Sequence, residues 1–208
     1  MRNVAILVFN EVEVLDFSGP YEVFNVTAEL TEPTPFSVYT CAESAAPVKT
    51  RGNLVIHPNY SITSMPQADI LLIPGGQGSR ALLKKPHILT WLRDQSTQVE
   101  YLLSVCTGSL VLAAAGLLNG KAAATHHSAF EHLQQLAPSC TVVRDQRYVV
   151  SDRVISSGGI AAGIDMALYT VRSLLGDSAV ATTLGEMEYA WSPQTDLRWP
   201  EAVIALEA

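Results

Sequence analysis

A cysteine stands at the centre of the segment Ser-Val-Cys-Thr-Gly, which occupies positions 104–108. Val99–Val105 is rich in large and β-branched apolar residues, as in a buried strand, and Leu110–Gly116 predicts a helix that ends at glycine. A nucleophile on a sharp strand-to-helix turn needs small residues two positions before and after it, and this serine and glycine meet that need. The helix N-terminus would also favour the thiolate. The pattern predicts a nucleophilic Cys106 on such an elbow, although many cysteines in apolar surroundings only pack.

Asp16 is the candidate proton donor for this cysteine. It closes the exit loop of the first predicted strand and stands between Leu15 and Phe17, an unusual setting for a carboxylate that remains in water. Burial, together with a neighbouring thiolate, would raise its pKa, so that it holds a proton at neutral pH and acts as a general acid. The alternative is that Asp16 caps the helix that it precedes, which is a common use of aspartate.

Two glycines, Gly75 and Gly76, follow another predicted strand at 69–74 and allow the backbone to approach a ligand closely. If this loop lies beside the elbow, its amides and the N–H of Thr107 would form a pocket that stabilises the negative charge developing during attack on carbon. The alternative is a plain loop that uses glycine for its backbone angles.

His126 and His127 end a short predicted strand, 122–125, and a Cys–His pair is a common way to activate a thiol. Adjacent residues of a strand point to opposite faces, so at most one of the two imidazoles would line the site, and the residues alone do not decide which. No His, Cys, Asp or Glu cluster has the spacing of metal ligands, and the sequence after Gly75 lacks the Lys-Ser/Thr of a phosphate-binding loop. We therefore expect neither a metal nor a cofactor.

The elements that must position these residues alternate between strand and helix. This alternation, with buried strands, predicts an α/β fold with a doubly wound, largely parallel sheet sandwiched by helices, whose ligands bind at the carboxyl ends of the strands. The expected strands are 3–9, 36–41, 69–74, 99–105, 122–125, 142–143, 148–150 and 154–156, with an excursion through 48–60. The expected helices are 17–30 (with Ser18 as its cap and Pro20 in its first turn), 86–96, 110–116, 128–136, 160–175 and 177–191, and the tail 199–208 is either a short helix or frayed.

Composition limits the class of protein. At 208 residues, with 48% hydrophobic and 16% charged residues, the chain suits one folded domain over residues 1–208. The net charge of −7, without a Lys- or Arg-rich run, argues against nucleic-acid binding. Three cysteines without CxxC spacing argue against a disulfide framework or a zinc site. With no cleavable signal pattern and no apolar run near the roughly 20 residues that span a bilayer, we expect a soluble cytoplasmic protein with a small-molecule substrate and no membrane or nucleic-acid partner.

Three motifs, Asp69–Gly76, Ser104–Gly108 and Gly158–Asp165, occur in an order that resembles the ThiJ/PfpI superfamily, and the resemblance covers nearly the whole chain. It implies the glutamine-amidotransferase-like, flavodoxin-type fold. Within this superfamily, Leu15–Pro20 and Cys106–Leu118 are most similar to the isonitrile hydratases. Those lyases add water to an isonitrile, R–N≡C, and release an N-substituted formamide.

The resemblance also implies roles for individual residues. Cys106 would be the nucleophile that forms a covalent thioimidate, Asp16 the acid and Thr107 a residue that orients the intermediate, and His126 is favoured over His127 as the residue that faces the site. Proteolytic and deglycase branches usually carry glutamate at the acid position, and protease-like members have histidine directly after the cysteine, so this chain departs from both. It also reads Ala-Thr-His-His at 124–127, where the hydratases tend to have Thr-Thr-His-Trp, and therefore lacks an aromatic side chain of the kind that shapes pockets.

Two other functions fit the same resemblance. The domain also forms the sensor half of AraC-type regulators, where similar elbows occur, so a non-catalytic ligand- or redox-sensing protein is one alternative. Glyoxalase- or deglycase-like action on α-oxoaldehydes is another, and Asp16 disfavours it. Members of the superfamily are commonly homodimers, and the apolar segments 17–24 and 180–191 would serve as an interface.

Overall fold

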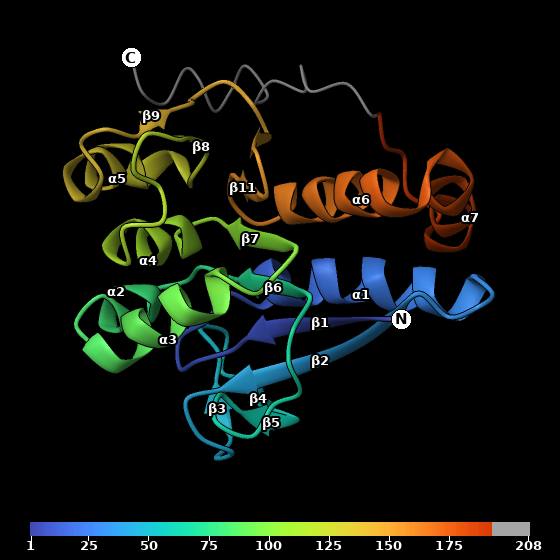
Figure 1. Ribbon diagram of the computed structural model, residues 1–208, viewed down its shortest axis with the longest axis horizontal. Helices are drawn as coiled ribbons and strands as arrows, with labels where there is room; N and C mark the ends of the chain where they lie inside the picture. The colour runs from blue at the N-terminus through green and yellow to red at the C-terminus, as the bar shows by residue number, and fades with distance from the viewer. Residues whose placement is uncertain (193–208) are drawn as a thin grey trace.

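A seven-stranded sheet forms the centre of the computed structural model, which describes residues 1–192, and helices cover both faces of the sheet (Figure 1). Neighbouring strands are parallel, except for one antiparallel pair at an edge. This confirms the predicted doubly wound, largely parallel α/β architecture. In order across the sheet, the strands are β10 (Tyr148–Ser151), β11 (Val154–Ser157), β7 (Tyr101–Val105), β6 (Ile70–Ile73), β1 (Arg2–Leu7), β2 (Phe36–Ala42) and β5 (Tyr60–Ser61).

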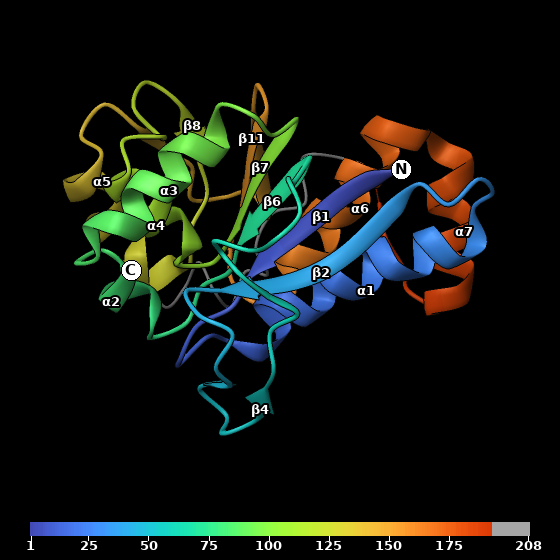
Figure 2. The same cartoon turned by 60° about the horizontal axis from the view of Figure 1, so that its bottom comes forward.

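Two helical layers enclose this sheet, as Figure 2 shows. In the first layer one long helix packs against two others: α1 (Val14–Leu30), α6 (Ala162–Leu175) and α7 (Asp177–Met187). In the second layer, on the opposite face, the helix that follows the elbow contacts three neighbours: α4 (Gly108–Ala114), with α2 (Ser79–Leu82), α3 (Pro86–Ser96) and α5 (Phe130–Leu136). Each layer buries one face of the sheet, so the core lies on both sides of it.

The central strands fix where the loops meet. All four side chains of β6, Ile-Leu-Leu-Ile, are buried, because a parallel strand covered on both faces needs apolar residues throughout. In the β6–β7 pair Ile73 lies opposite Ser104, and in the β7–β11 pair Val105 lies opposite Ser157. The carboxyl ends of three strands therefore meet at Cys106.

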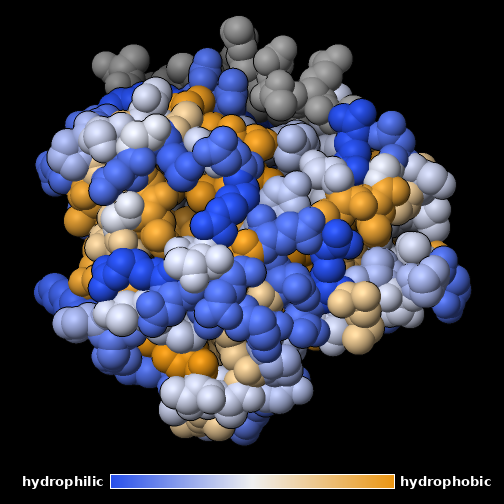
Figure 3. Space-filling view, viewed as in Figure 1, coloured by the Kyte–Doolittle hydropathy of each residue, from blue (hydrophilic) through white to orange (hydrophobic). Residues whose placement is uncertain are grey.

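Short strands and a 3₁₀ helix lie in the connections between the larger elements. The excursion through 48–60 forms a small antiparallel ladder of β3 (Val48–Lys49) and β4 (Val55–Ile56), and β8 (Ala122–Ala123) pairs in parallel with β9 (Thr141–Val142). A 3₁₀ helix, His127–Ala129, precedes α5. The face seen in Figure 3 is largely hydrophilic, with hydrophobic patches between the hydrophilic residues. No helix among residues 1–192 is long and apolar enough to span a bilayer.

Several helix boundaries differ from the predictions: the helix after the elbow spans Gly108–Ala114, not 110–116, and the helix predicted at 128–136 begins at Phe130. The first helix begins at Val14, so Ser18 is not its cap and Pro20 lies inside it. The earlier start follows from the loop before it, where the N–H of Glu13 donates to the carbonyl of Gly75 and holds the chain at the helix entrance. The last described helix ends at Met187, where Glu188 adopts a left-handed conformation (φ 47°), and α6 begins at Ala162. The predicted tail 199–208 lies outside the described residues.

Candidate active site

Cys106 occupies a tight turn between β7 and α4. Its φ angle is +56°, a left-handed conformation that is rare for residues other than glycine. Such strained backbone conformations cluster at functional sites. Its N–H donates to the carbonyls of Ser157 and Gly158, each at 3.1 Å, which ties the turn to the end of β11. A Cβ on Gly108 would lie 2.0 Å from the carbonyl oxygen of Ile73, so the small residue two positions after the cysteine is a steric requirement.

Asp16 lies in the first turn of α1 and is completely buried. One of its oxygens, Oδ2, accepts a hydrogen bond from the N–H of Gly75 (3.0 Å), and Oδ1 accepts one from the N–H of Ile160 (3.2 Å). The thiol of Cys106 is a third hydrogen-bonding partner of this carboxyl group. The capping alternative is therefore wrong, because the carboxyl group bonds to the loops after β6 and β11 and not to the start of its own helix.

Burial dominates the protonation of this pair. It raises the pKa of Asp16 to about 7, against the opposing effect of hydrogen bonds from Gly75 and Cys106. Burial and the nearby Asp16 carboxylate raise the pKa of Cys106, and hydrogen bonds from Thr107 lower it only in part. The expectation that the helix N-terminus gives a low thiol pKa is therefore corrected, since α4 is short and the sulfur is shielded from water. A thiolate would form here only if the thiol proton moved to Asp16.

The Gly75–Gly76 loop positions this pair. The N–H of Gly75 is used by Asp16, and the N–H of Gly76 donates to Thr107 Oγ1 at 3.0 Å. Both amides are thus bonded within the protein, and their expected role in stabilising developing charge stays a prediction. A Cβ on Gly75 would lie 2.6 Å from the nitrogen of Thr107 and 2.8 Å from Oδ2 of Asp16, so glycine is required for the close approach. The N–H of Thr107 is directed to the Cys106 sulfur.

Ser79 also supports the site, although its sequence context did not predict this. Its fully buried hydroxyl lies 2.9 Å from Thr107 Oγ1 and 2.8 Å from the carbonyl oxygen of Gly76. The hydroxyl of Thr107 is therefore held from two sides, by an amide and by Ser79. A serine just after a glycine-rich loop is common at the start of a helix, so nothing in the sequence distinguished this one.

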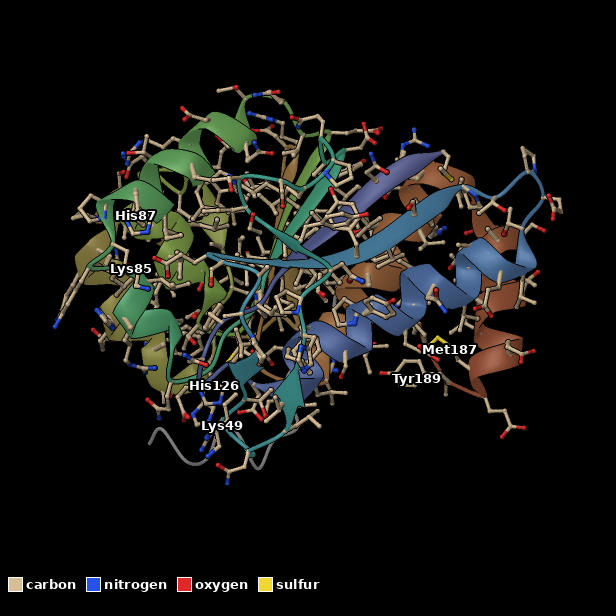
Figure 4. All side chains as sticks on the ribbon, turned by 90° about the horizontal axis from the view of Figure 1, so that it is seen from below. Lys49, Lys85, His87, His126, Met187 and Tyr189 are labelled. Atoms are coloured by element: carbon tan, nitrogen blue, oxygen red, sulfur yellow. The ribbon has the colours of Figure 1, made fainter. Side chains whose placement is uncertain are left out.

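The two histidines have different positions. Neither lies on a strand, because β8 ends at Ala123, and their rings lie 4.2 Å apart. His126 precedes the 3₁₀ helix, where its Nδ1 accepts a hydrogen bond from the N–H of Ser128 (3.3 Å), and it lines the cavity that contains Cys106. Figure 4 shows His126 at the same end of the molecule as Lys49 of β3. Burial lowers the pKa of His126, and its neighbour His127 lowers it further.

The cavity in front of Cys106 is small, about 70 Å³. It is polar and carries two arginines that the sequence analysis did not single out. Its lining consists of Glu13, Arg51, Gly76, Gln77, Arg80, Cys106, Thr107, His126, Ser128 and Ile160. A larger hollow of about 280 Å³ lies elsewhere, beside Glu43, Lys85 and Ile88, and its lining includes no cysteine or histidine. Among residues 1–192 no three His, Cys, Asp or Glu side chains cluster as metal ligands would.

Comparison with known proteins identifies the family. Residues 2–173, which include Asp16, Cys106 and Ile160, match the model of the DJ-1/PfpI family. The chain belongs to the DJ-1/PfpI family. This confirms the superfamily that the sequence motifs indicated, and the family match includes the loops after β1, β6, β7 and β11 that form the site.

Relatives within the DJ-1/PfpI family differ in function. An isonitrile hydratase from Pseudomonas putida is 35% identical over 198 residues, which cover 95% of this chain and 83% of that protein. A helix-turn-helix transcriptional regulator from Pseudomonas aeruginosa is 25% identical over 82% of this chain and 46% of its own length. The crystal structure of a ThiJ/PfpI family protein from Pseudomonas syringae superposes with a TM-score of 0.85 at 27% identity, covering 99% of this chain and 84% of that one. Family membership alone therefore does not define the activity.

Proposed function

We propose that this protein is an isonitrile hydratase, which converts R–N≡C and water into the formamide R–NH–CHO. The observation that carries the proposal is the pairing of a buried carboxyl group, whose pKa is about 7, with the thiol of Cys106. An isonitrile needs a proton and a nucleophile at the same carbon atom, and this pair offers one of each. The relationship to the isonitrile hydratase from Pseudomonas putida supports the same reaction.

In the first step the reactive form of the pair holds one proton, on Asp16, and the sulfur of Cys106 is a thiolate. Asp16 gives its proton to the terminal carbon of the isonitrile while the sulfur attacks that carbon. A C–H and a C–S bond form, one of the C–N π bonds breaks, and its electron pair stays on nitrogen. The product is a neutral thioimidate, R–N=CH–S–Cys, beside the Asp16 carboxylate.

In the second step the Asp16 carboxylate accepts one proton from an attacking water molecule, and the second water proton is transferred to nitrogen. The oxygen adds to the thioimidate carbon, and the C–S bond then breaks with its electrons returning to sulfur. The formamide leaves, and the pair again holds one proton on Asp16. Thr107, with its amide directed to the sulfur, would stabilise the thiolate at the start and end of this cycle.

A direct test follows the infrared stretching band of a small aliphatic isonitrile in the presence of the purified protein. We expect the band to disappear and the formamide to accumulate with the wild-type protein, whereas Cys106→Ala leaves the band intact. Retention of most of the activity in Cys106→Ala would contradict the covalent mechanism.

Failure of the wild-type protein to consume the isonitrile at high concentration would overturn the proposed activity. It would favour the ligand- or redox-sensing alternative, since the regulator from Pseudomonas aeruginosa is related over 82% of this chain.

A further inference from the structure

We propose that the site selects small isonitriles that carry a carboxylate group and that Arg80 is the residue that recognises this group. The inference rests on the proposed function and names its substrate class. For the simplest member, isocyanoacetate, the reaction is ⁻OOC–CH₂–N≡C + H₂O → ⁻OOC–CH₂–NH–CHO. The carboxylate is unchanged in the reaction and serves only for binding.

The cavity with Cys106 carries positive side chains. The protein as a whole carries a net charge of −7, yet two guanidinium groups, those of Arg51 and Arg80, line the small cavity with Cys106. One carboxylate, Glu13, accompanies them there, and it is paired with Arg51 at 2.9 Å. His126 adds no charge at neutral pH, because burial lowers its pKa. The arginine and glutamate side chains of the lining thus leave one positive charge, that of Arg80, while the Asp16–Cys106 pair holds one negative charge in its reactive form.

The side chain of Arg80 has no partner among the residues that the structure describes. The Arg80 side chain is half-buried, and among residues 1–192 it makes no hydrogen bond or ion pair. A guanidinium group has five N–H donors in a planar fork that fits a carboxylate, and partial removal from water makes such a pair stronger than it would be at the surface. A ligand carboxylate in the cavity would satisfy these donors.

The backbone of Arg80 is fixed relative to the elbow that carries Cys106. Arg80 is the second residue of α2, directly after Ser79. The hydroxyl of Ser79 bonds to Thr107 next to the nucleophile, and α2 packs against α4, which begins at the elbow. A carboxylate held by Arg80 would therefore lie in the cavity that also contains Cys106, and the small cavity restricts the substrate to a few atoms between its two functional groups.

The test compares isocyanoacetate with its uncharged methyl ester as substrates of the wild-type protein and of Arg80→Gln. We expect the wild type to prefer the acid, and Arg80→Gln to lower kcat/KM for the acid about ten- to a hundredfold, mainly through KM. The value for the ester should stay within about twofold. Arg93→Gln is the matched control, since Arg93 lies on α3 and bonds to Thr90 of its own helix. Equal losses for acid and ester, or a wild-type preference for the ester, would overturn the inference.

A binding experiment separates this inference from the proposed function. Cys106→Ala, with and without Arg80→Gln, is titrated calorimetrically with N-formylglycine and with its methyl ester. Binding of the acid that is lost with Arg80→Gln supports the carboxylate site even if no isonitrile is consumed, in which case only the hydratase activity fails. Binding that is equal in the two variants, or absent in both, contradicts the role of Arg80 whatever the activity.

Discussion

The carboxyl group of Asp16 and the thiol of Cys106 form a buried hydrogen-bonded pair, although one lies in the first turn of α1 and the other on the elbow after β7. Asp16 is completely buried, and Cys106 is 6% exposed. The N–H groups of Gly75 and Ile160 hold the two carboxyl oxygens, so the orientation of Asp16 toward the sulfur is fixed. A proton can move between oxygen and sulfur without passing through bulk water.

The alkylation of Cys106 should depend on the protonation of Asp16. Below pH 7 both groups are protonated, because burial raises the pKa of Asp16 to about 7 and also raises that of Cys106. Above pH 7 the Asp16 carboxylate can accept the thiol proton, so a constant fraction of thiolate forms. We expect the rate of alkylation by iodoacetamide, measured by mass spectrometry from pH 5 to 9, to rise up to about pH 7 and then level off.

The control for this experiment is Asp16→Asn, which should show no step near pH 7. Cys41, whose pKa is raised to about 12 by burial, is the unreactive internal reference. The same pH profile in the wild type and in Asp16→Asn would show that Asp16 does not control the thiol.

Asp16→Asn should abolish most of the turnover of isonitriles while the fold is retained. Asparagine keeps the shape and can still accept one of the two amide hydrogen bonds, but it has no transferable proton. Loss of general acid catalysis typically costs about 10²- to 10⁴-fold, so we expect kcat/KM to fall within this range. Circular dichroism should match that of the wild type. Activity within threefold of the wild type would assign the proton to another group.

The stability of the protein should fall between pH 4 and pH 7 because of Asp16. Its pKa is raised from 3.8 in the reference state to about 7 in the folded state, so the folded protein binds this proton more tightly. The resulting stabilisation is complete below the unfolded pKa and is lost as the pH rises through the folded pKa, with a magnitude of about 4 kcal/mol. Urea unfolding at pH 4, 5.5 and 8 should show this decline in the wild type but not in Asp16→Asn. A constant difference in the free energy of unfolding between the two proteins would refute it.

How far the sequence predicts this site depends on the range of the interactions involved. The elbow is local, because the small residues around Cys106 follow from its tight turn, and the apolar β6 and β7 predict the parallel sheet. The hydrogen bonds of the Gly75 and Gly76 amides depend on how the loops after β1, β6 and β7 pack together, so the sequence could not predict that both amides are bonded within the protein.

The position of Arg80 in the wall of the cavity could not be predicted from the sequence either. An arginine two positions after a glycine has no special local pattern, and only the packing of α2 against α4 brings it to the wall of the cavity with Cys106. The backbone of Ile160 could not be predicted either. It adopts a left-handed conformation (φ 57°), which is not expected for a β-branched residue, and its N–H donates to Asp16. Interactions between residues distant in the chain are set by tertiary packing.

Gly75→Ala should impair the site more than any comparable change at an open glycine. The added Cβ would meet the nitrogen of Thr107 at 2.6 Å and Oδ2 of Asp16 at 2.8 Å, and neither atom can withdraw without breaking a hydrogen bond of the pair. We expect a loss of about 2 kcal/mol or more in the free energy of unfolding and about a hundredfold in kcat/KM, because the acid and the nucleophile are displaced from each other. Gly52→Ala is the control, since no atom lies within 4 Å of its Cβ position, and it should leave both quantities nearly unchanged. If Gly75→Ala behaves like Gly52→Ala in urea unfolding and in activity, the close contact at Gly75 does not hold the pair together.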